Sequence, residues 1–69
     1  MRIYTVTEGD RAVAVVRAAD PADAIDTALD MLPTERSVTE LAVRDPDDAD
    51  MVGWLERRTD YVTEQATAA

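Results

Sequence analysis

ADPADAIDTALDMLP, residues 19–33, decides the fold because it carries a helix start, a helix period and a helix stop together. Asp20 is a good N-cap, and Pro21 occupies the first helical position, where its missing N–H costs nothing. Pro33 ends the helix. The sequence therefore predicts one amphipathic helix with a narrow apolar stripe, and we expect the flanking segments to form the sheet that covers it. The stripe consists of Ile25, Ala28, Leu29 and Leu32.

Two strands are predicted before this helix. Residues 2–7 alternate with period two and are rich in strand-forming residues, and residues 11–18 return as a second strand after a turn built on Gly9. Side chains alternate between the two faces of a sheet, so this register defines the face that packs against the helix. That face carries Tyr4, Val6, Ala14, Val16 and Ala18.

The opposite face of the hairpin is too apolar to be solvated, because Ile3, Val13 and Val15 point that way. Something should cover these side chains. The cover could be the C-terminal segment, a second copy of the chain or a different protein. A homodimer through Ile3, Val13 and Val15 is therefore one of three possibilities.

The segment after the helix predicts a loop over residues 34–37 and a third strand over residues 38–44, with Leu41 and Val43 toward the helix. Asp45-Pro46-Asp47-Asp48 then repeats the D-P-x-D start of residues 20–23, which predicts a second helix from about Pro46. Gly53 weakens a helix by ~1 kcal/mol relative to Ala. Residues 51–55 could therefore be helix or strand.

These elements predict an α+β fold. It consists of a small antiparallel sheet in β-β-α-β order, one helix packed on one face, and a second helix near the C-terminus. Residues 1–62 form a single small domain in this interpretation. Residues 63–69 lack an apolar stripe and are expected to be a frayed or disordered tail.

The charge balance restricts the partners. The 69 residues include 15 acidic and 7 basic ones, all seven of them Arg, for a formal net charge of -8. Repulsion of phosphate argues against direct binding to nucleic acid or to anionic membranes, and no apolar run reaches the length of a membrane span. We therefore predict a soluble, cytoplasmic protein. A Lys-free, Asp- and Ala-rich chain is typical of a high-GC bacterial or phage genome and equally of a salt-loving archaeon.

The chain lacks the usual groups of enzyme chemistry. It has no Cys nucleophile and no His base, and its two glycines form no phosphate-binding loop. We predict no enzymatic activity, no cofactor and no metal. The acidic cluster Asp45, Asp47, Asp48 and Asp50 fails the spacing of a calcium loop in either register, and it is better explained as an N-cap followed by acids in the first turn of a helix.

Two groups of residues are candidate partner-binding sites. Asp23, Asp26 and Asp30 lie on the outer face of the first predicted helix, which is either a solvated face or a docking stripe for a basic partner. Trp, Tyr and Arg are the residue types enriched in binding hot spots, and several of them lie within eight positions near the C-terminus. On a continuous helix, Met51, Leu55 and Val62 would share one side. The second candidate site lies partly on the adjoining side, and Trp54 in it could serve the core or an interface; its residues are Trp54, Arg57, Arg58 and Tyr61.

A further pattern runs through Tyr4, Val6, Gly9, Val16, Ala18, Asp20, Pro21, Ala24, Ile25 and Ala28. It resembles the hairpin-then-helix pattern of many small phage and prokaryotic accessory proteins, and it covers the first half of the chain. The resemblance implies a small module that binds a host or neighbouring protein. We therefore predict a non-enzymatic acidic protein-binding module, such as an accessory factor that modulates a host protein. The alternatives are an acidic nucleic-acid mimic that antagonises a DNA-binding protein, and a homo-oligomeric structural or salt-adapted domain.

Overall fold

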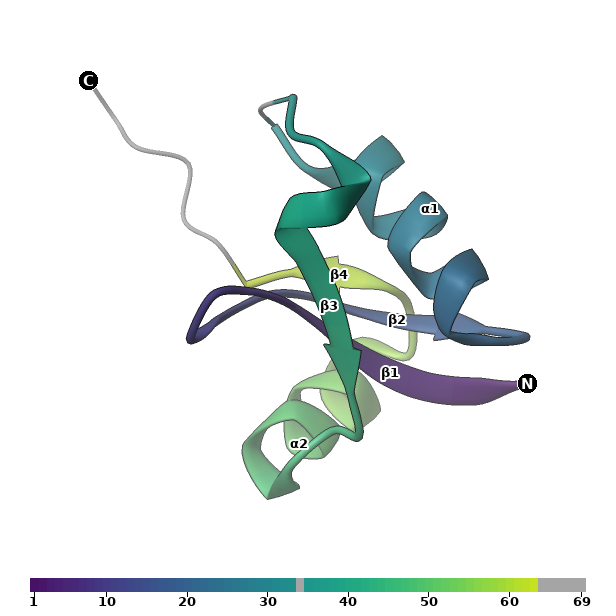
Figure 1. Ribbon diagram of the computed structural model, residues 1–69. Helices are drawn as coiled ribbons and strands as arrows, with labels where there is room; N and C mark the ends of the chain where they lie inside the picture. The colour runs from purple at the N-terminus through teal and green to yellow at the C-terminus, as the bar shows by residue number, and fades with distance from the viewer. Residues whose placement is uncertain (34, 64–69) are drawn as a thin grey trace.

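The computed structural model describes residues 1–33 and 35–63, and it confirms the predicted α+β class (Figure 1). A four-stranded antiparallel sheet in the order β3-β1-β2-β4 lies between two helices. Helix α1 covers one face of the sheet, and α2 lies against the other. In chain order the elements are β1 (Arg2–Glu8), β2 (Arg11–Ala18), α1 (Pro21–Met31), the 3-10 turn η1 (Val38–Glu40), β3 (Leu41–Arg44), α2 (Asp48–Arg57) and β4 (Tyr61–Val62).

The β1–β2 hairpin has the predicted register from Arg2 to Val6, and a β-bulge shifts the pairing between Val6 and Thr7. Tyr4 pairs with Val16 and Val6 with Ala14, which places these side chains on the α1 face. Gly9 adopts a φ of 60°, a conformation that its missing Cβ makes accessible and that the tight turn requires. The hairpin thus supplies most of the buried core, because these four side chains are almost completely inaccessible to solvent.

Helix α1 begins as predicted, but the line of residues that it buries against the sheet is not centred on the predicted apolar stripe. The Asp20 carboxylate accepts a hydrogen bond from the Asp23 N–H at 2.8 Å, and Pro21 is the first helical residue. Ala24 and Ala28 are fully buried, whereas Ile25 and Leu29 are only partly buried at the sides. Alanine at the centre allows the helix to lie close to the strands, so the larger side chains pack around the contact.

The second face of the sheet is covered by the same chain. Thr5 and Val15 are fully buried, α2 packs over this face, and Tyr61 of β4 pairs with Val15. Val13, at the bulge of the hairpin, is fully buried in the α1-side core, and Ile3 is only partly buried. Among the three predicted covers, the structure therefore uses the C-terminal segment. Of the three residues predicted to form a homodimer contact, Val13 and Val15 are buried within one copy, and Ile3 keeps part of its surface exposed.

Two predicted boundaries in the second half of the chain are corrected by the structure. The predicted strand over residues 38–44 begins only at Leu41, because the Ser37 hydroxyl accepts from the Thr39 N–H and caps a 3-10 turn. Leu41 and Val43 do pack toward α1, as predicted. Residues 51–55 are helical, but α2 ends at Arg57, and Arg58 adopts a left-handed φ of 54°. The predicted helical side of Met51, Leu55 and Val62 is therefore wrong.

The end of the described chain is held to the sheet. Thr63, predicted to start the tail, donates from its N–H to the Val13 carbonyl at 2.9 Å and from its hydroxyl to the Ala12 carbonyl at 2.7 Å. The predicted tail residues 64–69 and the predicted loop residue Thr34 lie outside the described residues. Over residues 1–33 and 35–63, neither helix has the length and apolar character needed to cross a membrane.

Candidate partner-binding surface

The inner side of α2 is fixed to the sheet through Asp50, which is 9% exposed. Its carboxylate accepts from the Thr5 hydroxyl at 2.8 Å and lies 3.1 Å from Nη1 of Arg44. Asp47 and Asp50 also form a reciprocal capping box, which confirms the N-cap interpretation of the acidic cluster. The hydrogen bond from the Asp50 N–H holds the pKa of Asp47 below its ordinary value. This network therefore determines which side of α2 faces inward.

Tyr61 of β4 holds the middle of α2 from the same side. Its hydroxyl donates to the Asp50 carbonyl at 2.9 Å, and its ring lies so close to Gly53 that a Cβ there would be 2.8 Å from Tyr61 Cζ. The Arg57 guanidinium lies 4.4 Å from the centre of the ring and donates to the Gly53 carbonyl at 3.1 Å. Burial and the charge of Asp50 raise the pKa of Tyr61, and the Arg57 charge opposes them.

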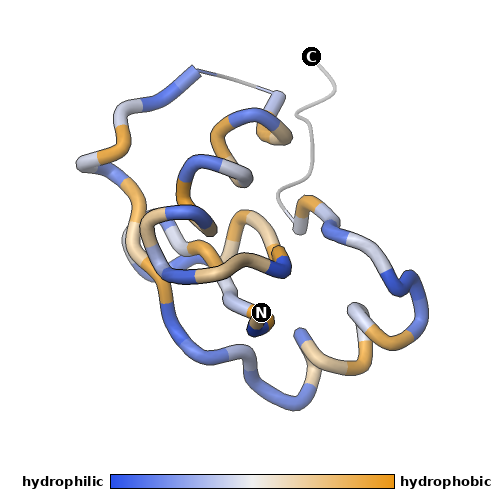
Figure 2. Tube along the Cα trace, turned by 90° about the vertical axis from the view of Figure 1, so that its right-hand side faces the viewer, coloured by the Kyte–Doolittle hydropathy of each residue, from blue (hydrophilic) through white to orange (hydrophobic). Residues whose placement is uncertain are grey.

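The opposite side of α2 presents apolar side chains to solvent. Val52 and Leu55, three residues apart and therefore neighbours on a helix, are 54% and 58% exposed. Asp48 and Glu56 are exposed beside them. Figure 2 shows this helix with a hydrophobic middle between hydrophilic ends. We call Asp48, Val52, Leu55 and Glu56 the outer α2 face.

The structure separates the aromatic and Arg residues predicted as one site. Arg57 and Tyr61 contact each other, but they do so in packing β4 against α2. Trp54 is half-buried, so it takes part in the packing of α2 and also reaches solvent. Arg58 is exposed at the C-cap. Tyr61 is therefore better placed to position α2 than to contact a partner.

Val52 and Leu55 are residues that the sequence interpretation did not place at a site. An amphipathic pattern normally assigns apolar residues to the core, and the sequence places Leu55 on one side of the predicted helix with Met51 and Val62. The signal that could have revealed them is the crowding of apolar residues between 51 and 55, which is more than one side of a ten-residue helix can bury.

The predicted acidic residues of α1 lie on the far side of the sheet from α2 (Figure 1). The Asp23 carboxylate accepts from the Ala19 N–H at 3.1 Å and so completes the start of α1. Asp26 and Asp30 are exposed, and neither forms an ion pair within the described part of the chain. The two predicted binding surfaces are therefore separate.

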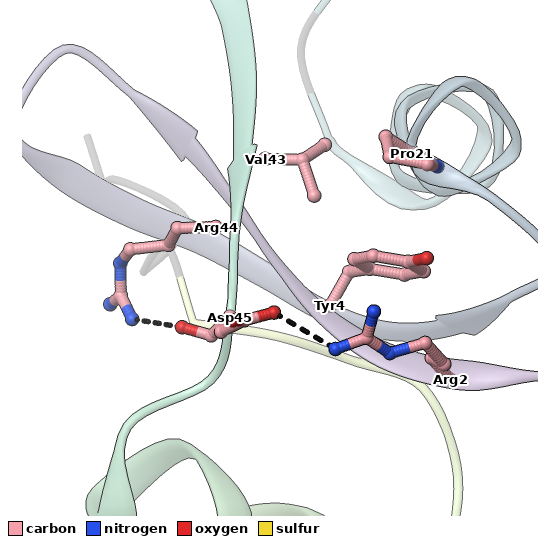
Figure 3. Close-up of a pocket in the computed structure, with 6 residues that line it drawn as sticks. All are labelled: Arg2, Tyr4, Pro21, Val43, Arg44 and Asp45. Atoms are coloured by element: carbon pink, nitrogen blue, oxygen red, sulfur yellow. Dashed lines mark hydrogen bonds and ion pairs between the residues drawn. The ribbon is translucent and has the colours of Figure 1, made fainter.

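A shallow pocket lies between the start of α1 and the ends of β1 and β3 (Figure 3). The Tyr4 ring, Pro21 and Val43 form its apolar part. The Arg2 guanidinium lies 5.7 Å from the centre of the Tyr4 ring and 3.3 Å from the Asp45 carboxylate, and Arg44 points away from the pocket. The opposite charges of Arg2 and Asp45 at its mouth thus form an ion pair.

No set of three His, Cys, Asp or Glu side chains within the described residues is arranged to hold a metal ion. No protein-family model matches the sequence, and neither a curated protein nor a solved structure matches it. The outer α2 face is therefore the feature of the described surface from which a function can best be argued.

Proposed function

We propose that this protein is a non-enzymatic, acidic protein-binding module whose contact surface is the outer α2 face. The observation that carries the proposal is the exposure of Val52 and Leu55, 54% and 58%, on a helix whose other side is firmly anchored. Two aliphatic side chains on one helix turn lose hydration only if another surface covers them. A partner that covers Val52 and Leu55 would therefore be bound in part by the hydrophobic free energy of burying these two side chains.

The surroundings of these side chains suit a protein contact. Trp54 and Arg58 belong to the residue types that dominate binding energy, and both reach solvent on or beside α2. Acidic residues flank the apolar pair at Asp48 and Glu56, which provides the polar rim of a typical interface. The resemblance of the first half to phage and prokaryotic accessory proteins makes a host protein one class of partner.

The test is capture of proteins from a lysate of the source or host cell by three forms of the chain. Val52→Asp with Leu55→Asp removes the apolar pair without touching the anchors of α2. Asp26→Asn with Asp30→Asn changes an exposed pair on the opposite side of the sheet and serves as the matched control. The proposal predicts a protein captured by wild type and by the α1 variant but lost with the α2 variant. Equal capture by all three forms would contradict it.

A second candidate function is antagonism of a DNA-binding protein by charge mimicry. Asp26 and Asp30 favour it, because they are exposed four residues apart on a helix without a basic residue. The same three forms distinguish this candidate. It predicts capture of a basic nucleic-acid-binding protein that is lost with the α1 variant and released by DNA. Retention of that protein by the α1 variant would exclude the mimic.

A further inference from the structure

We propose that the free edge of β3 pairs with β3 of a second copy, antiparallel across a two-fold axis, and joins the two sheets into one. Strand β3 lies at one end of the order β3-β1-β2-β4, so only one of its sides is paired, with β1. In Figure 1 it runs across the front of the sheet, and in the described part of the chain no strand lies beyond it. Its four residues include no proline and pair with β1 in an unbroken register, so the strand lacks two of the features that prevent edge pairing.

The pairing of the other strands determines which backbone groups of β3 are free. The Arg17 N–H donates to the Asp60 carboxylate at 2.8 Å, directly before β4, so Arg17 directs its backbone groups toward β4. Successive residues of a strand direct theirs to opposite sides. The backbone groups of Val16 therefore point toward β1, those of its partner Tyr4 toward β2, and those of Thr5 toward β3.

Val43 consequently directs both its N–H and its C=O out of the sheet. Thr5 pairs with Arg44, so Arg44 directs its backbone groups toward β1 and its neighbour Val43 directs them the other way. Leu41 has the same orientation as Val43, but its N–H already donates to the Val38 carbonyl. The groups that the fold leaves at the edge of β3 are thus the N–H and C=O of Val43 and the C=O of Leu41.

These groups are complementary to themselves across a two-fold axis at Val43. Each Val43 exchanges both backbone hydrogen bonds with Val43 of the second copy, and the Asp45 N–H donates to the Leu41 carbonyl of the second copy. The reverse bond is not needed, because the Leu41 N–H is bonded to η1 and the Asp45 carbonyl accepts from the Arg44 guanidinium at 3.1 Å. In this register, every backbone group of residues 41–45 has a hydrogen-bond partner.

The charge of this edge also favours a second copy. Residues 36–45 contain two Arg, one Glu and one Asp, which gives a net charge of zero in a chain of -8. The exposed faces of both helices carry acidic residues, so two copies repel each other there. The β3 edge avoids that repulsion, and it has no net charge that would attract a basic partner. A second copy therefore suits β3 better than it suits either helix.

The side chains of β3 are compatible with this arrangement. Figure 3 shows Val43 and Tyr4 on the α1 side of the strand and Arg44 on the other side. The two-fold axis is perpendicular to the joined sheet, so both α1 helices lie on one face and the two Val43 side chains become neighbours. Val43 is half-buried in one copy and has surface left to bury. The contact is small compared with a standard interface of about 1,600 Å², so we expect a dissociation constant on the order of 100 μM.

Amide exchange of the wild-type protein, measured by NMR at about 10 μM and about 1 mM, tests the pairing directly. The Val43 amide should exchange about fourfold more slowly at the higher concentration, for a dissociation constant on the order of 100 μM. The Arg44 amide is the control, because it is paired with β1 in both states and its rate should not change. Equal rates for Val43 at the two concentrations would overturn the proposal. Protection of Val43 only when a captured protein is added would overturn it as well, because a different protein would then occupy the edge.

Two proline variants provide a matched pair. Val43→Pro removes the outward N–H of β3 and leaves the bonds to β1 in place. Val62→Pro does the same at the opposite edge, because its neighbour Tyr61 pairs with Val15 and Val62 therefore directs its N–H outward. In sedimentation equilibrium the wild-type mass should rise from 7.6 kDa toward twice that value. Val62→Pro should behave like wild type, and Val43→Pro should stay monomeric.

Far-UV circular dichroism and the urea midpoint verify that each variant is folded. Association of a folded Val43→Pro variant as strong as that of wild type would contradict the pairing, and if this variant does not fold, the exchange rates of the wild-type protein decide alone. The dimer and the proposed function are tested separately, because they use different surfaces. Val52→Asp with Leu55→Asp should therefore leave association through β3 unchanged.

Discussion

Gly53→Ala should destabilise this protein, although the same substitution inside an exposed helix normally stabilises by ~1 kcal/mol. A Cβ at position 53 would lie 2.8 Å from Cζ of Tyr61 and closer still to its hydroxyl. The ring cannot simply turn away, because its hydroxyl is bonded to the Asp50 carbonyl and its backbone is paired with Val15. Either α2 shifts away from the ring or the ring leaves its place.

The change in the free energy of unfolding caused by Gly53→Ala is the sum of opposing contributions. Overpacking costs ~1–3 kcal/mol, and loss of the Tyr61 hydrogen bond costs about 1 kcal/mol. The gain in helix propensity offsets ~1 kcal/mol of this cost. We therefore expect the free energy of unfolding, measured by urea denaturation with far-UV circular dichroism, to fall by about 1–3 kcal/mol.

The control is the same substitution in a Tyr61→Ala background. Without the ring, Gly53→Ala should stabilise by ~1 kcal/mol, so the effect of the substitution should differ between the two backgrounds by about 2–4 kcal/mol and in sign. If Gly53→Ala stabilises both backgrounds equally, Tyr61 does not lie against α2 and the anchoring described above is wrong.

Three further predictions concern the anchors and caps. Thr5→Val should lower the free energy of unfolding by ~1.5–3 kcal/mol in urea denaturation, because the Asp50 carboxylate loses a buried donor at 2.8 Å; Thr5→Ser, which keeps the donor, should lose less. Burial raises the pKa of Tyr61 above its ordinary value of 10.0. The neutral hydroxyl therefore contributes its full stability below pH 10, and this contribution is lost as the pH rises through the pKa of the folded state. A Tyr61→Phe variant whose stability has the same dependence on alkaline pH as wild type would contradict this. Asp20→Ala should cost about 1 kcal/mol in thermal or urea unfolding, and Asp20→Asn much less, since asparagine also caps the Asp23 N–H.

The first half of the fold could be predicted because its signals are local. Asp20 and Pro21 start α1 with their own side chains and ring, and Gly9 provides the turn that aligns the hairpin. Alternation then determines which side chains enter the core. The centre of the α1 stripe was displaced because Ala24 and Ala28 permit a close approach that hydrophobicity alone does not indicate.

The second half depends on contacts between distant residues. No glycine or proline follows Arg57, so the helical period seemed to continue to Tyr61, whereas Arg58 ends α2 in a left-handed conformation. Tyr61 then joins a strand through pairing with Val15, a partner that local pattern cannot identify. The candidate site in the structure, the outer α2 face, differs from the predicted aromatic and Arg cluster for the same reason. The side of α2 that faces the sheet is determined by the contact between Asp50 and Thr5 and not by the apolar residues of the helix.

Val52 and Leu55 are proposed to form the contact surface. The most direct test is methyl NMR of the wild-type protein, alone and with the captured partner. The methyl signals of Val52 and Leu55 should shift or broaden when the partner binds, while the buried methyls of Val13 and Val15 stay unchanged. Unchanged Val52 and Leu55 signals, with changes elsewhere on the surface, would contradict this proposal.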